Sequence, residues 1–93
     1  MNFHGIQNEI ADWHRKTFPT ASLKDIGLKL AEESGEFCRA IVEQEHPSLH
    51  RASTNELGQE IGDVLIVCLA LAAKAGLNGP ELLTDRWEQV KTR

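Results

Sequence analysis

The chain has 93 residues and a mass of 10.4 kDa, which leaves room for one small domain, residues 1–93, and for no second hydrophobic core. Charged residues make up 26% and hydrophobic residues 41%, a balance typical of a folded soluble protein and not of a disordered one. The net charge of −4 argues against a nucleic-acid-binding protein, which would need a local basic patch.

Helical periodicity and capping residues predict helices from the start of the chain, and no segment alternates as a strand would. The first helix covers about residues 3–16. The second covers residues 22–45, because Ser22 and Asp25 have the Ser-x-x-Asp spacing of a helix cap and Pro47 prevents continuation.

The second half of the chain predicts two more helices. A stronger capping box, Ser53-x-x-Glu56, opens a helix over residues 53–75, and Gly76 ends it. Pro80 stands at the first position of the last helix. The fold class is therefore all-α, a four-helix bundle with two long central helices.

The third helix is apolar on every side over residues 64–73. Such a helix must be covered all round, and three companions in one short chain cover it only partly. We therefore expect a homo-oligomer, a dimer or a tetramer, that completes the bundle. The apolar run is too short to cross a bilayer, so no membrane partner is expected.

Cysteine content and the N-terminus indicate a cytoplasmic protein. Cys38 and Cys68 are too few for the disulfide framework of a small secreted domain, and we expect both to be small buried residues. The first residues carry neither a basic segment nor an apolar one, so no signal peptide is expected.

Acidic residues are concentrated in the centre of the chain and fall on apolar helix faces. Residues 32–63 hold eight of the fourteen acidic residues and two of the ten basic ones. Glu33 lies within the apolar stripe of the second helix and Glu36 lies at its border. Glu60 lies on the apolar line of the third helix, and Asp63 follows one turn later.

Four carboxylates on inward or border faces predict a metal site. Unpaired buried carboxylates cost several kcal/mol each, and neighbouring like charges raise one another's pKa. A hard dication offsets both penalties, and an all-oxygen ligand set favours Mg²⁺ or Mn²⁺ over Zn²⁺. The alternative is a solvated acidic face with ion pairs such as Lys29–Glu33.

Two motifs resemble those of a known family. Residues 30–36 match the Glu-Glu-x-x-Glu motif of the MazG-like, all-α nucleoside triphosphate pyrophosphohydrolases, and residues 60–63 match their Glu-x-x-Asp motif. The resemblance implies hydrolysis between the α and β phosphates of a nucleoside triphosphate, giving monophosphate and pyrophosphate. It implies Mg²⁺ held by Glu33, Glu36, Glu60 and Asp63, and activity in a dimer or tetramer. Glu32 would hold a second metal or position the attacking water, although it points toward the polar side of its helix.

Candidates for substrate binding are Trp13, Lys24 and Lys29. Trp13, beside His14, could stack a base, with a core position as the alternative. The lysines could contact phosphates, with plain surface charge as the alternative. No residue indicates which base the chain prefers.

Other functions stay open on the sequence alone. Phosphoribosyl-ATP pyrophosphohydrolase shares the fold and the metal chemistry. A non-catalytic helical module for oligomerisation or nucleotide binding is the candidate from another class. Glu43-x-x-His46 matches half of a di-iron motif, but a di-iron bundle needs two copies and the chain has one.

Overall fold

The computed structural model describes residues 2–46 and 53–93 of the chain. Within these ranges it contains four helices and no strand, so the predicted all-α class is confirmed. The helices are α1 (Phe3–Thr17), α2 (Leu23–Glu45), α3 (Thr54–Lys74) and α4 (Gly79–Val90). Pro47, which we expected to end the second helix, lies outside the described residues.

Side-chain caps fix the starts of the long helices. Ser22 Oγ accepts a hydrogen bond from the Asp25 backbone N–H at 3.1 Å, and Asp25 Oδ2 accepts one from the Ser22 N–H at 2.9 Å. At α3, Ser53 Oγ accepts from the Glu56 N–H at 3.0 Å, but Glu56 returns no bond and stays exposed. The prediction that the Ser53 box is the stronger one is therefore wrong, because only the Ser22 box closes on both sides.

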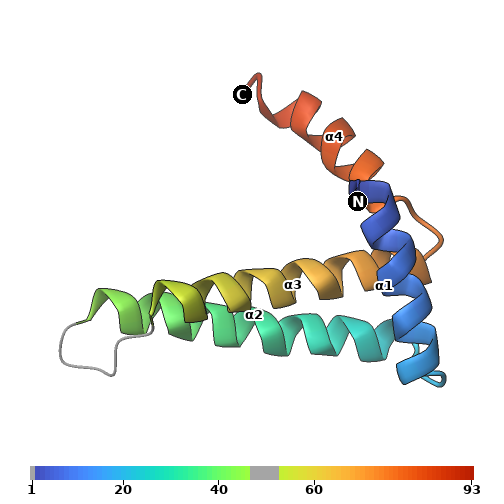
Figure 1. The fold of residues 1–93 in the computed structure, drawn as a ribbon. Helices are drawn as coiled ribbons and strands as arrows, with labels where there is room; N and C mark the ends of the chain where they lie inside the picture. The colour runs from blue at the N-terminus through green and yellow to red at the C-terminus, as the bar shows by residue number, and fades with distance from the viewer. Residues whose placement is uncertain (1, 47–52) are drawn as a thin grey trace.

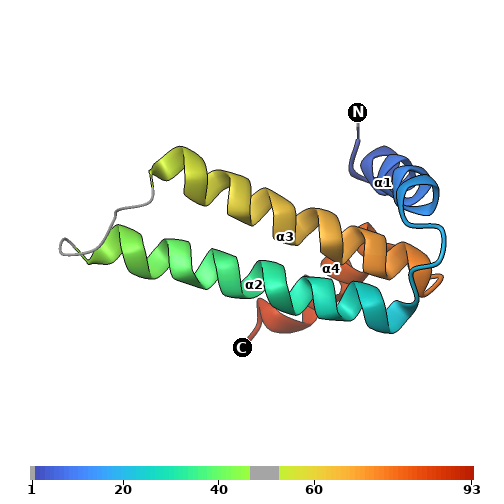
Figure 2. The same cartoon turned by 90° about the horizontal axis from the view of Figure 1, so that it is seen from below.

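The two long helices form an antiparallel pair that runs the length of the molecule, as Figures 1 and 2 show. Helix α1 packs against α3 at one end of this pair, and α4 contacts α1 and α3. Within the described residues α4 makes no contact with α2, and it points away from the pair (Figure 1). No helix of the described ranges has the length and apolar character needed to span a membrane.

The buried core of the single chain is small. Its apolar members are Ile26, Ala40, Leu69 and Ala70. The radius of gyration is 15.3 Å, whereas a compact domain of this length has a radius of about 12 Å. The elongated form leaves large apolar side chains exposed on all four helices.

Both cysteines are exposed, so the expectation that they are buried is wrong. Cys38 lies on α2 and Cys68 on α3, at positions that the packing of the four helices leaves open to solvent.

A buried glutamine connects the two ends of the chain and sets the start of α4. The side chain of Gln7 on α1 donates to the Leu77 carbonyl at 3.0 Å and accepts from the Gly79 N–H at 2.7 Å. A Cβ at Gly79 would lie 2.6 Å from Gln7 Oε1 and 2.7 Å from Leu69 Cδ2, so a larger residue there would displace the ends of these two side chains. Gly76 has a φ of 75°, which lets the chain turn out of α3 just before this contact.

We predict that Gln7→Leu lowers the free energy of unfolding by about 1–3 kcal/mol, the cost of leaving buried polar groups without partners. The substitution removes both hydrogen bonds to the α3–α4 connection and puts an apolar side chain of similar size in place of the amide. Urea denaturation followed by circular dichroism measures the change. Asn8→Leu, at the exposed neighbouring position, is the control. Equal stability of the two variants would contradict the role assigned to Gln7.

Candidate metal centre and adjoining cavity

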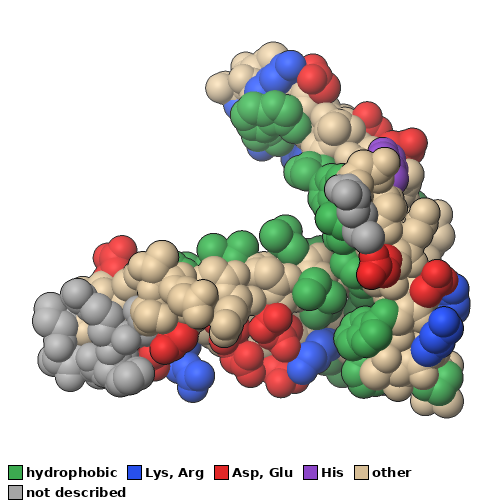
Figure 3. Space-filling view, viewed as in Figure 1, with side chains coloured by type: hydrophobic (Ala, Val, Ile, Leu, Met, Phe, Trp, Pro, Cys, Tyr) green, Lys and Arg blue, Asp and Glu red, His purple; other side chains and the backbone are tan. Residues whose placement is uncertain are grey.

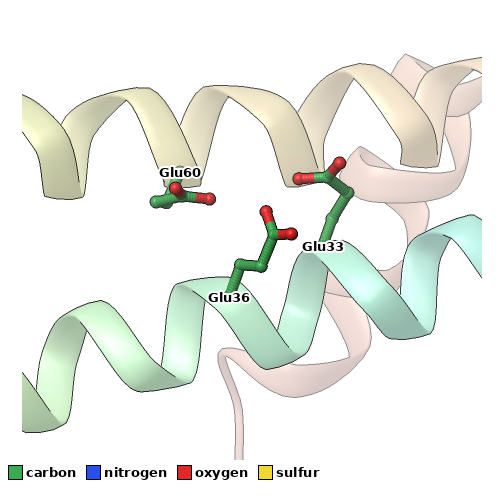
Figure 4. A group of neighbouring side chains, drawn as sticks. All are labelled: Glu33, Glu36 and Glu60. Carbon is green, nitrogen blue, oxygen red and sulfur yellow. The ribbon is translucent and has the colours of Figure 1, made fainter.

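Three glutamates meet in the space between the two long helices. Glu33 and Glu36 extend from α2 toward α3, and Glu60 comes from α3 (Figure 4). One carboxylate oxygen of each lies within 4.8 Å of the corresponding oxygens of the other two. Glu33 is only 8% exposed, while Glu36 and Glu60 are half-buried. Figure 3 shows acidic side chains gathered along this seam of the helix pair.

Two oxygens of this cluster are buried without a partner. Within the described residues, Glu33 Oε2 and Glu60 Oε2 have no hydrogen-bond donor and negligible contact with solvent. A buried charged oxygen without a partner is costly, so native structures almost always supply one. A bound water or a cation is the kind of partner that would satisfy these two oxygens.

The electrostatics of Glu60 point the same way. Partial burial raises the pKa of its carboxyl group, and the charges of Glu36, Asp63 and Glu33 raise it further. The nearby Arg39 acts in the opposite direction with a smaller effect. The folded protein thus disfavours the ionised form of Glu60 unless a positive charge enters the cluster.

Lys29 supplies one positive charge at the edge of the cluster. Its ammonium lies 3.1 Å from Glu33 Oε1 and 3.5 Å from Glu32 Oε1. The hydrogen bond to Glu33 and the charges of Glu32 and Glu33 raise the pKa of Lys29, so it stays protonated. The pairing orients Glu33, whose other oxygen is the buried one without a partner.

The remaining predicted site residues lie outside the group of three. Asp63 is exposed and lines the cavity described next, together with Glu33. Glu32 is exposed on the polar side of α2, as its position on the helix predicts, and it contacts Lys29 only through the long ion pair. Lys24 is exposed and lies outside the cavity lining.

A cavity of about 470 Å³ adjoins the acid cluster. It is bounded by one face of α2, the facing residues of α3, and the end of α1 with the turn that follows it. Its polar residues are His14, Asp25, Lys29, Glu33 and Asp63. Its volume falls in the range of sites for small molecules.

Aromatic rings form the end wall of this cavity. Trp13 is 51% exposed and makes an edge contact with Phe18, with ring centroids 5.8 Å apart and planes at 87°. The ring centroids of His14 and Phe18 lie 5.1 Å apart. Trp13 therefore lies on the cavity and not in the core. Phe18 was not among the predicted site residues, and its place just after the end of α1, five residues from Trp13, is the signal that could have identified it.

The donor set fits a hard divalent cation. It consists of carboxylate oxygens, which Mg²⁺ and Mn²⁺ prefer. One oxygen of each glutamate already lies within 4.8 Å of the others, so Glu33, Glu36 and Glu60 are the residues that would hold such an ion. A bound cation would also be a partner for the buried oxygens of Glu33 and Glu60, which have none in the described part of the chain.

The fold and the site together define an all-helical protein with an acidic centre between two antiparallel helices and an aromatic-walled cavity beside it. A family model for the MazG nucleotide pyrophosphohydrolase domain matches residues 21–89, so the chain belongs to the MazG family and the resemblance seen in the motifs is confirmed. This family generally depends on a divalent metal, and the cluster of Glu33, Glu36 and Glu60 is the acidic group available here. Comparison with curated proteins found no match, and comparison with solved structures found none.

We predict that metal-free Glu60→Gln is more stable than the wild type at neutral pH. The raised pKa means that the folded wild type binds more protons than the unfolded chain above the usual carboxyl pKa. Its stability therefore falls as the pH rises through the raised pKa, and the neutral amide removes this loss. Thermal melts in the presence of EDTA, at acidic and at neutral pH, measure the difference. The difference should vanish at acidic pH, where both side chains are neutral.

Proposed function

We propose that the chain hydrolyses (deoxy)nucleoside triphosphates between the α and β phosphates, with Mg²⁺ or Mn²⁺, to nucleoside monophosphate and pyrophosphate. The observation that carries the proposal is the pair of buried carboxylate oxygens without partners, on Glu33 and Glu60, next to a cavity with an aromatic wall. Membership of a nucleotide pyrophosphohydrolase family supports the reaction. We further propose that residues 1–93 act as one cytoplasmic domain, since α1 packs on α3 and both cysteines are free thiols.

The metal would be held by Glu33, Glu36 and Glu60, with Asp63 as a fourth ligand from the cavity side. A bound divalent cation supplies charge neutralisation on the phosphate oxygens and lowers the pKa of a coordinated water. Among the described residues, the cavity lining holds no serine, threonine, cysteine or tyrosine that could act as a nucleophile, which agrees with direct attack by water.

Other residues of the chain would bind and orient the substrate. Lys29, held protonated beside Glu33, offers an ammonium to the phosphates at the edge of the acid cluster. Glu32 helps to keep Lys29 protonated, and its direct role on water or on a second metal stays a prediction. Trp13, exposed on the cavity wall, presents an indole face to the base. Contact between Lys24 and the substrate stays a prediction.

We also propose that the active form is a homo-oligomer. The chain exposes 6758 Å², against roughly 5,400 Å² for a folded monomer of its mass. The excess is larger than the roughly 800 Å² that one partner buries in a standard interface. Figure 3 shows hydrophobic side chains on the side of α4 that faces back toward α3 and along the facing edge of α3. Leu83 and Trp87 of α4 are each 58% exposed.

The activity test is release of pyrophosphate from a panel of nucleoside triphosphates with and without Mg²⁺. We predict that Glu60→Gln lowers kcat by about 100-fold or more, equivalent to roughly 2.7 kcal/mol of barrier, because an amide is a poor ligand for a hard cation. Glu45→Gln, an exposed position on α2 away from the cluster, should retain full activity. Wild-type turnover by the Glu60 variant would refute the assignment of the site.

The products identify the bond that is cut. Phosphorus NMR should show nucleoside monophosphate and pyrophosphate, whereas a nucleoside diphosphate with orthophosphate would mean attack at the γ position. Phosphoribosyl-ATP belongs in the same panel, because its preferred hydrolysis would favour the alternative enzyme of this fold. Absence of turnover on every substrate, with nucleotide binding retained, would favour the non-catalytic module.

We predict that the wild type sediments at two or four times 10.4 kDa at micromolar concentration. Leu83→Lys should shift the protein toward the monomer, because a charge would enter the apolar face of α4. Asp85→Lys is the matched control, since it lies on the opposite side of α4, about 200° around the helix from Leu83. A wild-type monomer, or dissociation by both variants alike, would contradict the proposed interface.

A further inference from the structure

We propose that Asp25 selects the nucleobase, and that the chain prefers triphosphates of the amino bases cytosine and adenine over those of the keto bases uracil and thymine. The inference rests on the proposed function, because it assumes that the cavity beside the acid cluster receives a nucleotide. In the residue pattern alone, nothing indicated a base preference or a residue responsible for one.

One face of α2 sets the order of groups along the cavity. Asp25, Lys29 and Glu33 follow one another at intervals of four residues, so they share this face, and all three line the cavity. Glu33 belongs to the acid cluster, and Lys29 comes next with its ammonium. Asp25 lies about 12 Å from Glu33 along the helix axis, at eight residues of 1.5 Å each. A nucleotide has a comparable span from its α-phosphate to the pairing edge of its base.

The aromatic wall places the base at the same end of the cavity. Trp13, His14 and Phe18 line the cavity together with Ala21 and Asp25, which belong to the α1–α2 turn and the first turn of α2. A triphosphate held at Glu33 and Lys29 therefore extends its base toward the rings, where stacking is favourable for any base. Stacking does not discriminate between bases, so a preference for one base over another must come from the polar groups at the aromatic end of the cavity.

Asp25 is held as a hydrogen-bond acceptor. Its Oδ2 accepts from the Ser22 N–H at 2.9 Å, which fixes the carboxylate against the start of the helix. Within the described residues Oδ1 has no partner, and an ionised carboxylate can accept several hydrogen bonds. The bond from the Ser22 backbone lowers the pKa of Asp25, so at neutral pH the group is an acceptor only.

This chemistry separates the bases into two groups. Cytosine and adenine carry exocyclic amino groups at matching positions of their pairing edges, and a carboxylate is the acceptor that suits these donors. Uracil and thymine carry a carbonyl oxygen where cytosine carries its amino group. Two acceptors facing each other repel, so the keto pyrimidines lose a contact and gain an unfavourable one.

Two matched substrate pairs test the inference. Deoxycytidine and deoxyuridine triphosphates differ at the amino or keto group of the pyrimidine, and ATP and ITP differ in the same way in the purine. We expect kcat/KM to favour the amino member of each pair by about tenfold or more, within the range that one good base contact supplies. Isothermal titration calorimetry with dCMP and dUMP compares the affinities of the two bases without turnover.

Asp25→Asn is the decisive variant. An amide can both accept and donate, so it can keep the cap at Ser22 while accepting either base type. The ratio within each pair should fall to about threefold or less, with faster hydrolysis of the keto substrate. Asp12→Asn is the control, because Asp12 is an exposed aspartate on α1, paired with Arg15 and outside the cavity lining, and it should leave the ratio unchanged. Thermal melts confirm that both variants fold.

The outcomes separate the two proposals. If no nucleotide is hydrolysed, the proposed function fails, while selective binding of dCMP over dUMP that Asp25→Asn removes would still support the role of Asp25. If the wild type hydrolyses both members of each pair equally or prefers the keto member, or if Asp25→Asn keeps the wild-type ratio, the inference is overturned and the proposed function stands.

Discussion

Repulsion among carboxylates held between two helices is the constraint on which this structure depends. Glu33, Glu36 and Glu60 bring their oxygens together where solvent screens them poorly, and one lysine at the edge offsets only part of the charge. In a chain with a small apolar core, this repulsion is a large fraction of the free energy of unfolding. A divalent cation bound in this cluster would offset the repulsion, and its binding would stabilise the folded protein.

The elongated form of the single chain is a second consequence of its small apolar core. Helix α4 leaves the helix pair and shows its apolar side chains to solvent, and the outer faces of α2 and α3 are similarly bare. The start of α4 is held by the contact of Gln7 with the connection from Leu77 to Gly79, and a Cβ at Gly79 would displace the Gln7 side chain from this contact. The exposed apolar side of α4 is the surface on which we propose that a second copy packs.

Much of the fold and part of the site could be predicted from the sequence because they are local. Helix starts at Ser22 and Ser53, and glutamates on apolar faces, depend on spacings of three or four residues. Other features depend on contacts between distant segments. The hydrogen bond between Gln7 and Gly79 joins residues 72 positions apart, and no short sequence pattern predicts it. The exposure of Cys38 and the place of Phe18 beside Trp13 likewise follow from how the helices pack, and helical spacing alone does not determine packing.

The first turn of α2 links the folding of the helix to the layout of the cavity. The Ser22 cap fixes where the helix begins, and each residue after it is rotated by about 100°. A start displaced by one residue relative to the α1–α2 turn would carry Glu33 off the seam and Lys29 off the cavity. Because Asp25 belongs to that cap, the group that fixes the rotation of the helix also lies on the cavity wall. The position of Asp25 relative to Lys29 and Glu33 is thus held by the helix backbone itself, and rigid backbone elements are where binding groups are best held.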